Sequence, residues 1–175
     1  MFATLAARRH LMRVFIAFGV LSVSPGAVFS AFLLDDEPDG TPRREAEVHL
    51  PAFPEPENLI PFTVGSVRGT HFSIDEKSIS VDSDGTIRYS LVVISPSGAR
   101  NVSFEGMRCA TGERRAYAFG RPDRTWSKAR SDKWIRIQGG NNSHHVALFA
   151  DYFCAIGQKT IMTPEDAIRA LRYGG

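Results

Sequence analysis

The densest group of chemically active side chains lies in residues 100–136. This segment carries ten basic and four acidic residues, a net charge of +6, and aromatic residues are interleaved with them. Cationic side chains beside aromatic rings can hold phosphates and other anions and can stack on flat groups. We expect an anion-binding surface here, against the alternative of arginines dispersed over a solvated surface. The residues assigned to it are Arg108, Arg114, Arg115, Trp126, Arg130, Trp134 and Glu105.

Two of these residues, Glu105 and Arg108, flank Gly106 in a strand predicted over 99–109. Glycine inside a strand suggests a bulge, and bulges often re-aim side chains beside binding sites. A bulge at Gly106 would also turn the apolar residues on both sides of it toward one core. The planar guanidinium of arginine meets a carboxylate with two bonds, so we expect a structural ion pair between Glu105 and Arg108, with membership in a site as the alternative.

Candidate catalytic groups lie near the C-terminus, where His144 and His145 precede a helix that carries Asp151. A nucleophilic hydrolase needs a serine, a histidine and a carboxylate in register, and the sequence has no GxSxG motif to nominate the serine. Neighbouring residues on a helix diverge by about 100°, so the two histidines do not readily share one metal ion. We therefore assign no catalytic residue, no metal ligand and no cofactor. A hydrolase using His144, Asp151 or Glu105 is the alternative function.

The chain has two cysteines, Cys109 and Cys154. In an oxidising compartment an even pair predicts a disulfide, and two buried free thiols are the alternative. The pair lacks the CxxC spacing and the further ligands typical of structural zinc.

The N-terminus has the pattern of a secretory signal peptide. Arginines precede an apolar run over residues 14–23, and Ser24-Pro25-Gly26 interrupts it. Small residues favour cleavage after Ser30, so residues 1–30 are predicted to be removed. Ten helical residues span about 15 Å, half of a bilayer core, which disfavours the alternative of an uncleaved anchor. We expect an exported protein with no transmembrane anchor after processing.

Residues 31–61 follow as an acidic, proline-rich segment. Residues 31–62 hold eight acidic and two basic residues, whereas residues 63–175 hold 16 basic and 11 acidic residues. Proline removes a backbone donor and fixes φ, so we predict a largely disordered tether. The alternative is an acidic cover that packs on the basic domain through its apolar residues, which are Leu50, Phe53, Leu59 and Ile60.

Residues 62–175 read as one α+β domain. Alternating apolar residues predict short strands separated by turns such as Asp82-Ser83-Asp84-Gly85 and Ser95-Pro96-Ser97-Gly98. Helical spacing follows over 144–154 and from Pro164 onwards. Strands first and helices last predict an antiparallel sheet of about four to six strands with two C-terminal helices packed on one face. The disulfide would then join a strand to the covering helix.

Three sequence blocks, SGARNVSFEGMRC, RRAYAFG and ALFADYFC, resemble the cryptic neisserial protein 1-like family of exported bacterial proteins. The resemblance covers about residues 62–173. It implies a periplasmic location in a Gram-negative cell, and it carries over no catalytic residue and no cofactor.

Together these features predict a non-enzymatic envelope protein that binds an anionic partner. An acidic protein and an anionic envelope lipid are the candidate partners, because an exported address counts against nucleic acid. A periplasmic hydrolase is the alternative.

Overall fold

The computed structural model describes residues 45–65, 67–139, 143–155 and 161–174. The predicted signal peptide, its cleavage site and the tether as far as residue 44 lie outside these residues.

The described strands form one antiparallel sheet in which six strands pair in chain order. A seventh, two-residue strand pairs with β5 beside β6. The strands are β1 (Leu59–Phe62), β2 (His71–Val81), β3 (Thr86–Ile94), β4 (Arg100–Arg108), β5 (Glu113–Gly120), β6 (Trp126–Lys128) and β7 (Ile135–Arg136). The helical elements are η1 (Pro56–Asn58), α1 (Ser143–Ala147), η2 (Leu148–Phe153) and α2 (Pro164–Tyr173).

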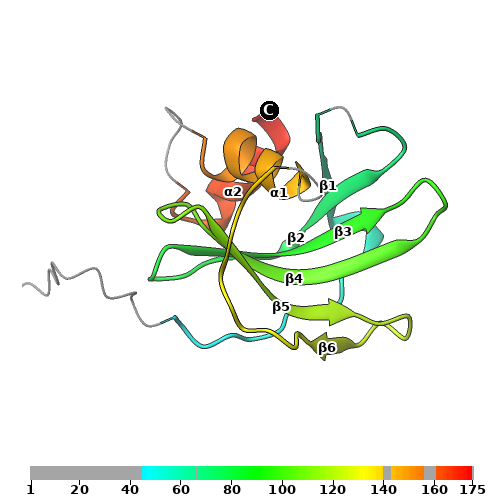
Figure 1. The fold of residues 1–175 in the computed structure, drawn as a ribbon, viewed down its shortest axis with the longest axis horizontal. Helices are drawn as coiled ribbons and strands as arrows, with labels where there is room; N and C mark the ends of the chain where they lie inside the picture. The colour runs from blue at the N-terminus through cyan, green and yellow to red at the C-terminus, as the bar shows by residue number, and fades with distance from the viewer. Residues whose placement is uncertain (1–44, 66, 140–142, 156–160, 175) are drawn as a thin grey trace, which may run out of the picture. The chain divides into compact units, whose positions relative to one another are not determined.

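The C-terminal helices cover one face of the sheet (Figure 1). Side chains alternate between the faces of a strand, so Ile87, Tyr89 and Leu91 of β3 all face the helices. The ring of Tyr89 packs 5.4 Å from that of Phe153 on η2. At the start of α2, the Thr163 side chain accepts a hydrogen bond from a backbone N–H of the first turn. The predicted α+β class and helical layer are confirmed.

The helix predicted over 144–154 is not a regular α-helix throughout. It begins as α1 and widens into the π-helix η2, which ends where the Cys154 N–H donates to the Phe149 carbonyl at 2.8 Å. Adjacent residues Tyr152 and Phe153 are both buried there. Tyr152 packs on Phe62 of β1, so the wider turn places two consecutive aromatic rings against different strands.

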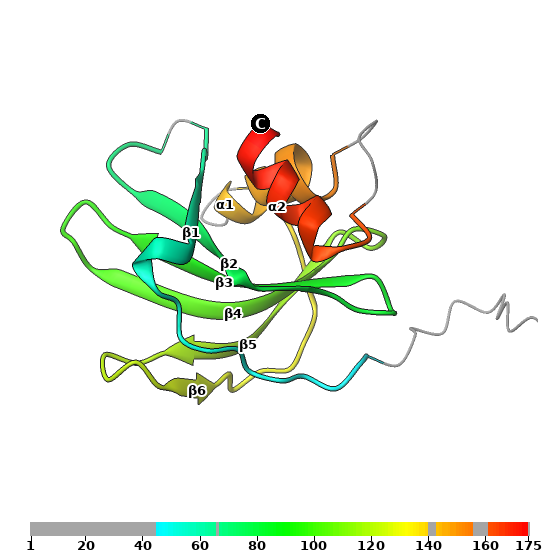
Figure 2. The same cartoon turned by 180° about the vertical axis from the view of Figure 1, so that it is seen from behind.

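The opposite face of the sheet carries a second apolar cluster, formed by Phe104, Tyr117 and Ala118. Residues 45–55 lie across this face, on the side away from the helices (Figures 1 and 2). Trp126 fixes the segment, because its indole N–H donates to the Pro51 carbonyl at 2.9 Å. Both faces of the sheet are therefore covered.

The N-terminal segment differs from the tether predicted over 31–61. Its last residues form η1 and the edge strand β1, so the folded domain does not begin at residue 62. Proline has no N–H to satisfy, so a proline-rich segment can lie across a sheet without ladder partners. Of the apolar residues named for an acidic cover, Ile60 is buried and Phe53 packs on Trp126, whereas Leu50 is half-exposed.

The bulge predicted at Gly106 is wrong. The β3–β4 register runs unbroken from Thr86 opposite Arg108 to Ile94 opposite Arg100, and the irregularity lies in β5 instead. A bulge is unnecessary because both faces of the sheet are covered, so apolar side chains at odd and at even positions of β4 are buried on opposite faces. Gly106 has a different role: a Cβ there would lie 2.5 Å from the hydroxyl of Tyr117, whose ring crosses the strand.

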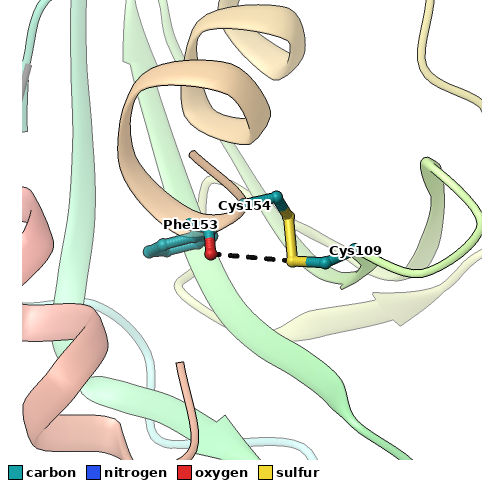
Figure 3. Close-up of a disulfide and its surroundings, with 3 residues drawn as sticks. All are labelled: Cys109, Phe153 and Cys154. Atoms are coloured by element: carbon teal, nitrogen blue, oxygen red, sulfur yellow. Dashed lines mark hydrogen bonds between the residues drawn. A yellow bond between two sulfur atoms is a disulfide. The ribbon is translucent and has the colours of Figure 1, made fainter. Parts of the chain in front are cut away.

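The disulfide between Cys109 and Cys154 is present. It joins the residue after β4 to the end of η2, and Cys109 Sγ lies 3.6 Å from the Phe153 carbonyl oxygen (Figure 3). The helical layer is thus held covalently to the sheet, as predicted.

Breaking this bridge should destabilise the domain substantially. The bridged residues are 45 apart, and the chain-entropy model gives a loss of about 4 kcal/mol in the free energy of unfolding. Urea denaturation of wild type and of the double variant Cys109→Ser/Cys154→Ser measures the difference. Reductant should destabilise the wild type and leave the variant unchanged; a wild type insensitive to reductant would contradict the prediction.

Candidate functional site

The most buried cation of the domain is Arg88 on β3, whose side chain is 4% exposed. It donates to the carbonyls of Ala46 at 2.7 Å and Glu47 at 3.1 Å. It also pairs with Asp82 at 2.9 Å and with Glu45 at 3.7 Å. A buried arginine needs such partners because an unpaired charge in the interior is costly. The sequence analysis assigned no role to Arg88, although a single charged residue among the apolar residues of a predicted strand indicates a buried, paired charge.

Glu45 is the centre of this network. Its carboxylate pairs with Arg115 at 2.6 Å and accepts a hydrogen bond from the Tyr117 hydroxyl at 2.5 Å. Burial, and secondly the bond to Glu45, raises the pKa of Tyr117 far above its ordinary value, so the phenol remains a donor. Arg115, predicted to bind an external anion, therefore binds an internal one.

Arg108 and Trp134 also have structural roles. The Arg108 guanidinium lies 3.9 Å from the Trp134 ring centroid and 3.2 Å from an oxygen of Asp84. Burial alone would raise the pKa of Asp84, but hydrogen bonds from Thr86 and Arg108 outweigh it and lower that pKa. The group fastens the end of β4 to the β2–β3 turn.

Glu105 does not pair with Arg108, which corrects the expected ion pair. The two residues are three apart in a regular strand, so their side chains point to opposite faces. Glu105 instead accepts from the Ser103 hydroxyl at 2.6 Å and lies 2.6 Å from Nε2 of His145. Burial opposes its ionisation, but these hydrogen bonds prevail and lower the pKa of Glu105.

This buried cluster does not have the order of a catalytic triad. The carboxylate of Glu105 sits between Ser103 and His145, whereas a hydrolase needs the histidine between serine and carboxylate. His144 stacks on the ring of Phe72, 5.2 Å away, instead of facing a nucleophile. Asp151 is exposed on η2. Among the described residues, no group of three or more His, Cys, Asp or Glu side chains could hold a metal ion.

A pocket of about 430 Å³ lies beside β5, on the same sheet face as the helices. Its β5 residues Arg114 and Phe119 pair with Met107 and Ser103 of β4. Met107 and Ser103 lie opposite Ile87 and Leu91, which face the helices, so the pocket lies on that face of the sheet. We call it the basic groove; its charged lining residues are Arg114, Lys128, Arg130 and Lys133, and its largest apolar ones are Phe119 and Ile135.

The basic groove combines unneutralised charge with exposed apolar surface. In the part of the chain that the structure describes, Lys128, Arg130 and Lys133 make no ion pair, and no acidic residue lines the groove. Phe119 and Ile135 are each 50% exposed. A ligand with a negative group and an apolar part would satisfy both features.

The structure thus divides the seven residues predicted for the anion-binding surface. Arg114 and Arg130 both line the basic groove. Lys128, Lys133, Phe119 and Ile135 line it too, although the sequence analysis did not assign them as binding residues. The other predicted residues stabilise the fold through internal contacts; they are Arg108, Arg115, Trp126, Trp134 and Glu105.

Fold and site define a disulfide-bonded α+β domain that presents a basic groove on its sheet. Its sequence matches the model of the CNP1-like family over residues 39–172, and the chain belongs to that family. The match begins before Glu45, so the segment that covers the second sheet face lies within the family domain. Comparison with curated proteins and with solved structures found no match. No described helix is long and apolar enough to span a membrane.

The histidine beside the buried cluster should make stability depend on pH. Burial, with His145 as the second cause, lowers the pKa of His144 from 6.5 to about 4. The unfolded chain therefore takes up a proton that the folded chain refuses, and stability should fall as the pH drops from about 6.5 to about 4. Urea denaturation across this range measures the slope for wild type and for His144→Gln.

His144→Gln should flatten this part of the profile, whereas His71→Gln, which removes an exposed histidine on β2, should leave it unchanged. An NMR titration that placed the pKa of His144 near 6.5 in the folded protein would contradict the prediction.

Proposed function

We propose that this protein is an exported, non-enzymatic binding protein of the bacterial envelope whose basic groove holds an anionic lipid. The carrying observation is the composition of the groove, which is lined by Lys128, Arg130 and Lys133, none of them ion-paired with a described residue, and by the exposed Phe119 and Ile135, which we call its apolar floor. Such a lining suits a headgroup phosphate bound by the cations and the adjoining hydrocarbon resting on Phe119 and Ile135.

The apolar floor favours a lipid over an acidic protein. Exposed aromatic and aliphatic side chains commonly mark interaction sites, and here Phe119 and Ile135 line the same pocket as the cationic side chains. An acidic peptide would match the charge but would leave the floor without an apolar partner unless it supplied one. The exported address counts against nucleic acid.

Two features support export. The N-terminal sequence has the pattern of a signal peptide cleaved after Ser30, and the chain carries a disulfide. The periplasm is the compartment that the sequence resemblance to exported bacterial proteins implies. The described pockets beside β5 and β6 do not support the alternative of a periplasmic hydrolase, because Glu105, His144 and Asp151 do not line them.

Neutralising the groove should abolish most lipid binding. Each basic side chain near an anionic bilayer contributes about 1 kcal/mol, so Arg130→Gln/Lys133→Gln should weaken binding by about 30-fold. Co-sedimentation with phosphatidylglycerol vesicles measures this, with phosphatidylcholine vesicles as the neutral reference. Binding should also weaken as salt rises.

The matched control is Arg68→Gln/Lys77→Gln, which removes one exposed arginine and one exposed lysine elsewhere in the domain and should bind like wild type. Equal loss in both double variants would show a general charge effect and contradict the assignment of the groove. Failure of wild type to distinguish the two vesicles would sink the lipid proposal and leave an acidic protein as the partner to test. Arg115 is excluded from the variants because it holds Glu45.

A further inference from the structure

A second basic pocket, of about 480 Å³, lies on the other face of the sheet. Three arginines line it: Arg100 at the start of β4, and Arg121 and Arg124 in the turn between β5 and β6. Phe53 of the N-terminal segment and Val102 form its apolar part. No acidic residue is among the lining residues, so the lining is positively charged. The pocket shares no lining residue with the basic groove.

Each guanidinium in this pocket is held in place by a neighbouring oxygen. The contacts join Arg100 to the Pro54 carbonyl at 3.3 Å, Arg121 to the Ser127 hydroxyl at 3.3 Å, and Arg124 to the Glu55 carboxylate. Arginine has five N–H donors, so each side chain is positioned and still has donors for a ligand. With Glu55 and Asp123 counted, the group still has a net charge of +1, because the Asp123 carboxylate interacts electrostatically with Arg121.

The backbone conformation of Arg124 indicates that its side chain has a role besides forming the turn. Its φ of 63° makes it the one described residue other than glycine with a positive φ. The turn closes through the Arg124 N–H to the Arg121 carbonyl at 3.0 Å, a geometry that glycine adopts without strain. Strained positions of this kind concentrate at binding sites, where the side chain is needed.

Gly120 explains how the floor of the pocket forms. A Cβ at this position would lie 2.8 Å from Cβ of Val102 and 2.9 Å from the ring of Phe53. Glycine therefore lets the Phe53 ring pack close to β5, where it lies next to the Arg124 guanidinium, 5.8 Å from ring centroid to carbon. The pocket thus has a flat apolar floor beside a cationic rim.

We propose that Arg100, Arg121 and Arg124 bind the phosphate of a small phosphate monoester whose body rests on Phe53. A monoester is close to a dianion at neutral pH, so the net positive charge of this group attracts it. Arginine binds phosphate oxygens through paired N–H donors. The pocket volume is in the range of small-molecule sites, so it accommodates a body larger than the phosphate itself. This site is independent of lipid binding in the basic groove.

Isothermal titration calorimetry with three probes tests the site. Glucose 6-phosphate should bind, inorganic phosphate should bind more weakly because it makes no contact with Phe53, and glucose should show no binding. Arg100→Gln and Arg121→Gln should each weaken binding of glucose 6-phosphate at least about tenfold, the loss expected for a hydrogen bond to a charged group. Equal affinity for inorganic phosphate would contradict the monoester and indicate a site for free phosphate.

Arg124→Gly is the decisive variant, because glycine adopts this turn conformation without strain while the guanidinium is lost, and it should weaken binding at least about tenfold. Arg172→Gln, which removes an exposed arginine paired with Glu76, is the control and should bind the ester like wild type. Unchanged affinity in the three pocket variants would overturn the proposal. Arg130→Gln/Lys133→Gln should keep full affinity, which separates this site from the basic groove.

Discussion

The interaction on which the rest of the structure depends is the contact of Glu45 and its neighbouring carbonyls with Arg88. Arg88 lies near the start of β3, on a face that would otherwise be open to water, and its charge must be paired to be buried. Asp82 supplies one partner, and the N-terminal segment supplies the others. By doing so it becomes the second layer over the sheet, and the tyrosine and tryptophan beneath it become a second core.

This arrangement explains why several arginines of the domain are not available to an external anion. Glu45 binds two of them, turn residues Asp82 and Asp84 bind Arg88 and Arg108, and Glu55 binds Arg124. The acidic segment and the basic domain are thus two halves of one folded unit. Among the described residues, Lys128, Arg130 and Lys133 make no ion pair, and they lie together in the basic groove beside β5. Arg100 and Arg121, which also make no ion pair with the described residues, lie in the second pocket on the other face.

The cluster around Glu105 also contributes to the stability of the fold through internal contacts. Ser103, Glu105 and His145 are all nearly inaccessible, and their hydrogen bonds run among themselves. They hold the helical layer to the sheet at the centre, as the disulfide does at the end of β4. Titratable groups in a small domain attract attention as catalytic candidates, but here their burial and their order indicate a polar link between two layers.

The sequence by itself determined the class of the fold, the disulfide and the family. Period-two alternation, turn residues and late helical spacing depend on neighbours in the chain, so the β3–β4 hairpin and α2 could be predicted locally. The tertiary structure decided which face each side chain occupies and what covers it. No local pattern shows that Glu45 meets Arg115, 70 residues away, or that Tyr117 crosses Gly106. Whether an arginine is free to bind a ligand depends on such distant partners, and these become visible only when the chain is folded.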